Sequence, residues 1–192
     1  MVTKNIEEKL MSKQAFRSIL DISNSYRNGE LSPVAVIDSC LKQVEKFDSK
    51  LGAFQALYAE DAREAAQAAE KAYQSGHRIG PFHGIPFALK DLIDIKGRIT
   101  TGGSKVMSKR TSPGTATIAR RLLAAGGILL GKTKTVEVAM GGWGTNEHMG
   151  TPWNPWDTKI ARTPGGSSSG SGVSVSAGLV GCAVGTDTGG SV

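Results

Sequence analysis

Two short stretches near the C-terminus, Pro164–Ser171 with the sequence PGGSSSGS and Gly185–Ser191 with the sequence GTDTGGS, consist mainly of glycine and hydroxyl residues. Residues 141–192 hold 13 of the chain's 25 glycines. Glycine- and serine-rich segments are often flexible linkers. Residues 173–184, between the two stretches, are mostly apolar, and linkers rarely carry so much apolar surface. We therefore interpret the two stretches as turns that approach a ligand closely at a single site.

The rest of the composition is that of an ordinary globular domain. The chain has 192 residues, 39% of them hydrophobic and 21% charged, which excludes a disordered tail or a collagen. This length supports about one domain with its own core. The two cysteines, Cys40 and Cys182, are too few for a disulfide framework and indicate a reducing compartment.

Periodicity predicts an α/β fold. Residues 1–78 read as helical, apart from a short strand within 53–58, and Ser32 followed by Pro33 marks the start of one helix. Residues 79–140 alternate strand-like and helix-like segments, as an α/β core does. The expected elements there are an apolar run at 85–95, a helix at 115–125 with Ile118, Leu122 and Leu123 inward, and a strand at 128–130.

The charge pattern argues against large polyanionic or membrane partners. The net charge is +6, but the basic residues are scattered, so we expect a solvated surface rather than a nucleic-acid site. Apolar runs stay well short of the roughly 20 residues that span a bilayer. The first residues, MVTKNIEEK, do not resemble a signal peptide, and the cytoplasm is the expected location.

Several motifs suggest chemistry that their context does not favour. Gly126–Thr133 matches the phosphate-loop pattern, but its middle residues are strand-like and a helix precedes it. Gly166–Gly170 matches a nucleophile elbow centred on Ser168, but all three histidines lie upstream of it. Those histidines have no metal-ligand spacing. Three tryptophans, Trp143, Trp153 and Trp156, lie in one loop. They could either anchor this loop to the core or line a pocket, and we favour the first.

Lys90 follows the apolar residues 85–89. A lysine in such a run either extends its amine outward to water or holds it in a pocket where the amine is neutral. The sequence alone favours the first alternative.

Taken together, these motifs resemble the amidase signature family. The resemblance rests on Pro164–Ser171, on Gly185–Ser191, on Lys90 within the sequence ALKD, and on Asn154–Asp157 with the sequence NPWD. It implies a mixed central sheet flanked by helices, with residues 1–78 as an N-terminal helical segment. Residues 79–192 would form the N-terminal part of the α/β core, in a single domain that is incomplete in this chain.

The family resemblance also implies a catalytic triad and an amide-cleaving reaction. Ser191 would be the nucleophile, Ser167 in a cis peptide would relay the proton, and Lys90 would be the base. A hydroxyl is a weak nucleophile without such a base, and burial would lower the pKa of Lys90 from about 10.4. No metal or cofactor is implied. The backbone groups expected at the oxyanion are those of Thr188, Gly189, Gly190 and Ser191.

Three functions remain open. The first is a hydrolase of a small carboxamide through a serine acyl-enzyme, which could form a homodimer. The second is the amidase (glutaminase) subunit of a tRNA-dependent amidotransferase, which would have partner subunits. The third is an inactive fragment or binding module. Ser169 stands where many members have glycine, and we expect the natural chain to continue beyond Val192.

Overall fold

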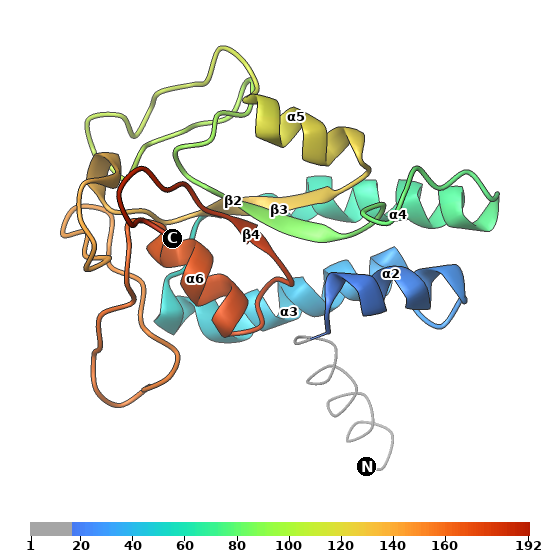
Figure 1. Ribbon diagram of the computed structural model, residues 1–192, viewed down its shortest axis with the longest axis horizontal. Coiled ribbons are helices and arrows are strands. Elements are labelled where there is room, and N and C mark those ends of the chain that lie inside the picture. The colour runs from blue at the N-terminus through green and yellow to red at the C-terminus, as the bar shows by residue number, and fades with distance from the viewer. Residues whose placement is uncertain (1–16) are drawn as a thin grey trace.

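A four-stranded mixed sheet forms the centre of the protein, for which a computed structural model describes residues 17–192 (Figure 1). Its strand order is β1 (Phe54–Leu57), β3 (Ile128–Thr133), β2 (Pro86–Lys90) and β4 (Ala183–Val184). β2 runs parallel to both β3 and β4, whereas β1 is antiparallel to β3. The predicted α/β class with a mixed sheet is confirmed.

Three helices surround β1 in sequence, as predicted: α2 (Ile19–Arg27), α3 (Pro33–Leu51) and α4 (Ala59–Gln74). The Ser32 hydroxyl accepts a hydrogen bond from the first turn of α3, and proline occupies the start of that helix, where its missing N–H costs nothing. Residues 1–16, on which the expectation about a signal peptide rests, lie outside the described residues. In the described part of the chain, no helix combines the length and apolarity of a membrane span.

The sheet is covered on both faces. α3 and α4 pack their apolar side chains against Ala88 and Leu130 on one face. On the other face, Ala119 of α5 (Thr117–Ala124) packs against Phe87. Figure 1 shows α5 above the sheet and α3 below it. Because β1 lies before residue 78 and pairs with β3, the two predicted parts of the chain share this sheet, and the division between them remains a prediction.

The predicted inward face of α5 is partly wrong. Leu122 packs against the core, but Ile118 and Leu123 are 44% and 40% exposed. The one fully buried residue of this helix is Ala119. A helix of only eight residues offers a narrow stripe, and the small side chain of Ala119 lets that stripe approach the sheet closely.

The helix α6 (Ser169–Ser176) differs from the turn that its sequence suggested. Its composition, SGSGVSVS, has poor helix propensity, so tertiary contacts stabilise it. A Cβ on Gly170 would lie 2.5 Å from the backbone nitrogen of Lys134, and it would also collide with the carbonyl oxygen of Ala53. Glycine therefore allows the start of α6 to lie directly against the ends of β1 and β3.

Candidate active site

Lys90 ends β2 and has no exposed surface. Its Nζ donates hydrogen bonds to Ser167 Oγ at 2.6 Å, to Thr186 Oγ1 at 2.9 Å and to the Thr186 carbonyl oxygen at 3.3 Å. All three acceptors are uncharged. Burial lowers the pKa of Lys90 to about 8, and the carboxylate of Asp187 partly opposes this shift. The amine is therefore held in a pocket and does not extend to water.

Ser167 is the buried partner of this lysine. Its side chain has no exposed surface, and the peptide bond between Gly166 and Ser167 is cis, which agrees with the expectation for this residue. The Ser167 carbonyl oxygen accepts hydrogen bonds from the N–H of Val136 at 3.1 Å and from the Thr135 hydroxyl at 3.0 Å. The segment that follows β3 thus fixes the backbone of Ser167 while its hydroxyl faces Lys90.

Hydrogen bonds from Ser168 connect the stretch Pro164–Ser171 to the stretch Gly185–Ser191. Its N–H donates to the carbonyl oxygen of Ser191 at 3.1 Å, and its hydroxyl donates to the same oxygen at 2.5 Å. The hydroxyl also lies 3.3 Å from the Thr186 carbonyl oxygen. Within residues 17–192 the Ser191 hydroxyl makes no side-chain hydrogen bond to Ser167. The structure therefore brings Lys90 into contact with Ser167, and it joins the backbone of Ser191 to Ser168, the residue that follows Ser167.

Thr188, Gly189 and Gly190 form an exposed turn before Ser191. The N–H of Gly190 donates to the Asp187 carboxylate. The N–H groups of Ser191 and Gly190, in that order, hold the pKa of Asp187 below its usual range. In this structure three of the four backbone donors expected at an oxyanion, those of Ser191, Gly190 and Gly189, are thus directed at the Asp187 carboxylate.

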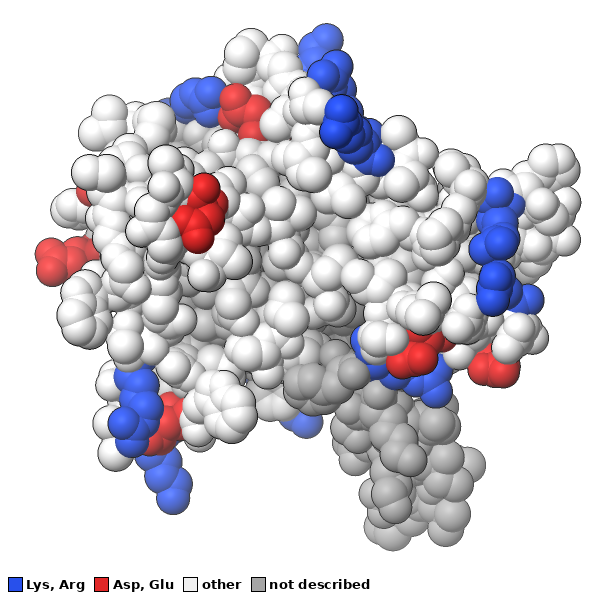
Figure 2. All heavy atoms as spheres, viewed as in Figure 1, with Lys and Arg blue, Asp and Glu red and all other residues white. Residues whose placement is uncertain are grey.

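A cavity of about 600 Å³ opens between the two stretches. Gly165, Gly166 and Ser168 line it on one side, and Gly190 and Ser191 line it on the other. Figure 2 shows charged side chains of both signs around the rim of this face, whereas its centre, over β4 and α6, is uncharged. The cavity lining has the same character, because it contains only glycine, serine, proline, alanine and valine. Such a lining suits a neutral ligand group such as a carboxamide.

The phosphate-loop match and the nucleophile-elbow match both have structural roles. The strand predicted at 128–130 is confirmed and extends to Thr133 as β3, and Lys132 is buried in an ion pair with Asp91. No open loop of N–H groups is left there to hold phosphate. At the nucleophile-elbow match, the Ser168 hydroxyl is bonded to backbone groups of Ser191 and Thr186 rather than to a histidine.

The expectation that the tryptophans pin their loop to the core holds for one of them. Trp153 packs against a buried cluster, and its Nε1 donates to the Asp157 carbonyl oxygen at 2.7 Å. Trp143 and Trp156 are 73% and 89% exposed, so the expectation was wrong for both.

The sequence suggested no catalytic role for Thr186 or Asp187, and it suggested one for Ser168 only through the nucleophile-elbow match, although all three lie in the quoted motifs. Thr186 accepts hydrogen bonds from Lys90, Ser168 donates to the carbonyl oxygen of Ser191, and Asp187 accepts from the N–H of Gly190. The available signal was their position beside the candidate residues. Only the folded chain shows which of these side chains turn inward.

Together these features define an α/β protein in which a buried lysine of lowered pKa contacts a serine beside an uncharged cavity. A family model described as "Amidase" matches residues 35–192. The chain belongs to the amidase signature family.

Its relatives have several activities. A glutamyl-tRNA(Gln) amidotransferase subunit from Halorhodospira halophila is 40% identical over 92% of this chain and 36% of its own length. The 2-amino-5-chloromuconic acid deaminase of Comamonas testosteroni is 39% identical over 93% of this chain and 38% of its own length. A solved structure described as an amidase superimposes on this chain with a TM-score of 0.84 at 35% identity. The superposition covers 92% of this chain and 40% of the amidase chain. The chain thus spans little more than a third of the length of these relatives.

Proposed function

We propose that the protein that carries this chain cleaves the C–N bond of a carboxamide through a serine acyl-enzyme. The observation that supports this most directly is the 2.6 Å contact between Lys90 Nζ and Ser167 Oγ. Both side chains are fully buried, and no carboxylate bonds to the lysine within residues 17–192. Because the pKa of Lys90 falls to about 8, a useful fraction of this amine is neutral near neutral pH and can accept a proton.

The proposed reaction moves one proton through Ser167. The Ser191 oxygen attacks the amide carbon while its proton passes to Ser167 Oγ, and the Ser167 proton passes to Lys90 Nζ. In the collapse of the tetrahedral intermediate, the C–N bond breaks and the same route returns a proton to the departing amine. Water then attacks the ester on Ser191, which releases the carboxylic acid and regenerates the hydroxyl.

The proposed oxyanion donors are the backbone N–H groups of Thr188, Gly189, Gly190 and Ser191. Negative charge on the former carbonyl oxygen would replace the Asp187 carboxylate as the acceptor of the Gly189, Gly190 and Ser191 N–H groups. Their position in an exposed glycine turn permits this change of partner, since glycine has wide backbone freedom.

Labelling with a fluorophosphonate tests the nucleophile. We expect the full-length protein to gain one adduct, which peptide mapping places on Ser191, and we expect Ser191→Ala to gain none. Ser108→Ala, a change at an exposed serine remote from the cavity, is the matched control and should label like the parent. An adduct on another serine, or undiminished amide turnover by Ser191→Ala, would contradict the proposal. A full-length protein that takes no label would favour the binding-module alternative.

A second candidate is the glutaminase subunit of a tRNA-dependent amidotransferase, which the 40% identity to an amidotransferase subunit favours. In that case the amide is glutamine, the released ammonia passes to another active site, and partner subunits are required. Ammonia release from glutamine, measured with and without the other subunits, separates the two candidates. Glutaminase activity that appears only with the partners supports the amidotransferase, whereas hydrolysis of simple amides by the isolated chain supports the hydrolase.

A further inference from the structure

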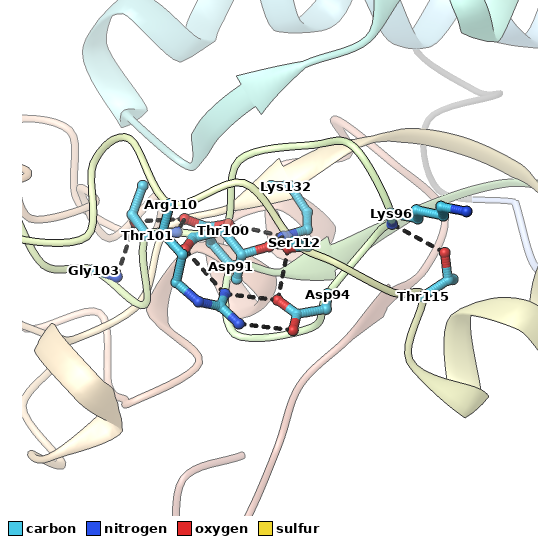
Figure 3. A network of polar contacts seen from close by, with 10 residues as sticks. All are labelled: Asp91, Asp94, Lys96, Thr100, Thr101, Gly103, Arg110, Ser112, Thr115 and Lys132. Atoms are coloured by element: carbon cyan, nitrogen blue, oxygen red, sulfur yellow. Dashed lines mark hydrogen bonds and ion pairs between the residues drawn. The ribbon is translucent and has the colours of Figure 1, made fainter.

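A second buried lysine lies directly behind the proposed base. Lys132, on β3, has no exposed surface, and its Nζ donates to Asp91 Oδ1 at 2.8 Å and to Thr100 Oγ1 at 3.0 Å. The other oxygen of the Asp91 carboxylate accepts from the Thr101 N–H at 3.0 Å and from its hydroxyl at 2.5 Å. Figure 3 shows this group of contacts. The proposed reaction uses none of these side chains.

The backbone of Asp91 is held as firmly as its side chain. Its N–H donates to the Thr133 carbonyl oxygen at 2.9 Å, and its carbonyl oxygen accepts from the Gly102 N–H at 2.9 Å. Thr133 is also the residue that pairs with Lys90 in the sheet. Asp91 is therefore the residue after Lys90, and Lys132 is the residue before Thr133, the strand partner of Lys90. The ion pair between them fixes the two strands next to Lys90. Movement of either would move Lys90 relative to Ser167.

The two side chains lie on the opposite face of the sheet from the Lys90 amine. Lys132 pairs with Leu89, whose side chain faces α5, whereas Thr133 pairs with Lys90 and contacts Ser171 of α6. Together Asp91 and Lys132 have no net charge. Loss of one partner would leave a single buried charge behind Lys90, and buried charges are weakly screened.

Few other titratable groups approach Lys90. α6, β1 and β4 contain none, and Asp187 faces the amine from the segment after β4. On the far face, Asp94 is paired with Arg110 through two contacts of 2.9 Å at the outer end of the network. Asp91 follows Lys90 in the chain and Lys132 precedes its strand partner, so a substitution in this pair changes the charge behind Lys90 without touching Ser167 or Ser191.

We propose that Asp91 and Lys132 are positioning residues for Lys90, which fix its place in the sheet and keep the charge behind it balanced. This inference rests on the proposed function, because it assumes that Lys90 acts as a base in its neutral form. The acid limb of the pH profile is the range over which the rate rises as Lys90 loses its proton. The inference predicts that substitutions of Asp91 and of Lys132 move this limb in opposite directions.

The test is the rate of fluorophosphonate labelling of the full-length protein as a function of pH. Lys132→Met leaves the Asp91 carboxylate unpaired, which favours protonated Lys90 and should move the acid limb to higher pH. Asp91→Asn leaves the Lys132 ammonium unpaired, which disfavours protonated Lys90 and should move the limb to lower pH. We expect shifts of about half a unit to one unit, smaller than the roughly 1–3 units caused by a charge in contact.

The double variant Asp91→Asn with Lys132→Met restores neutrality and should return the limb to its original position. The matched control is the exposed pair Asp38 and Arg63, joined at 3.2 Å between α3 and α4, whose single variants should leave the limb in place. A merely structural role would lower the rate without moving the limb. Unmoved limbs, or shifts of the same sign in both single variants, would overturn the inference.

Removal of one partner of a buried pair can prevent folding. If one single variant does not fold, the other decides together with the double variant: a shift in its predicted direction that the double variant reverses supports the inference, and an unmoved limb overturns it. Failure of the parent protein to label at Ser191 would instead count against the proposed function. A labelled parent with unmoved variant profiles would count against this inference alone.

Discussion

Lys90 and Lys132 lie on the adjacent strands β2 and β3, and neither has exposed surface, but their side chains project from opposite faces of the sheet. Lys90 donates to the hydroxyl of Ser167 and to the hydroxyl and carbonyl oxygens of Thr186, whereas Lys132 donates to the carboxylate of Asp91. Burial lowers the pKa of Lys90 to about 8, and no carboxylate of residues 17–192 hydrogen-bonds to its amine. The bonding partners of the two amines therefore distinguish the candidate base from the lysine of the buried ion pair.

The pH dependence of the reaction should report the pKa of Lys90. The amine must be neutral to accept a proton, and its pKa is lowered from 10.5 to about 8, so the rate should rise with pH through an acid limb near pH 8. The measurement is kcat/KM, or the labelling rate at Ser191, over pH 6 to 10, a range that spans this limb on both sides. A limb near the ordinary lysine pKa of about 10.4 would show that burial does not tune this group.

Ser167→Ala removes the relay between Ser191 and Lys90 without changing a charge. General acid–base steps contribute roughly 10²–10⁴-fold to rates, and we expect a loss of kcat/KM within that range. Circular dichroism and thermal unfolding would verify that the variant is folded. A loss of less than about tenfold would argue that Ser191 is activated by a different route.

Asp187→Asn should move the acid limb to lower pH. The Asp187 carboxylate raises the pKa of Lys90, so its neutralisation lets burial lower that pKa further. Asp157→Asn is the matched control, because backbone N–H groups also lower the pKa of Asp157, in an exposed loop. The Asp157 variant should keep the original limb. An upward shift in the Asp187 variant would contradict the electrostatic assignment.

Two glycines of α6 should respond oppositely to alanine. A Cβ on Gly170 would collide with the backbone of Lys134 and Ala53, so Gly170→Ala should destabilise the protein by about 1–3 kcal/mol. A Cβ on Gly172 meets nothing within 4 Å, and Gly172→Ala should stabilise the helix by up to about 1 kcal/mol. Midpoints of chemical denaturation of the full-length protein measure both changes. Equal effects of the two substitutions would refute the close approach of α6 to the sheet.

Local sequence signals predicted the elements that form from local interactions. The start of α3 follows from Ser32 and Pro33, because a hydroxyl cap and a proline need only the next turn of helix. β3 follows from a short apolar run after two glycines. Two predictions were wrong: the inward face of α5, and the burial of Trp143 and Trp156 against the core. Both depend on where the sheet lies.

By itself, the sequence determined the family and the order of its motifs along the chain, since both are properties of residue identity and spacing. The tertiary structure alone decided that Lys90 touches Ser167 across 77 positions of chain, and that Lys132 faces the other way to bind Asp91. It also decided that α6 is a helix, although its residues favour turns. These outcomes depend on the sheet register and on the close approach of backbone segments. Contacts between distant segments, rather than local propensity, determine the register and this approach.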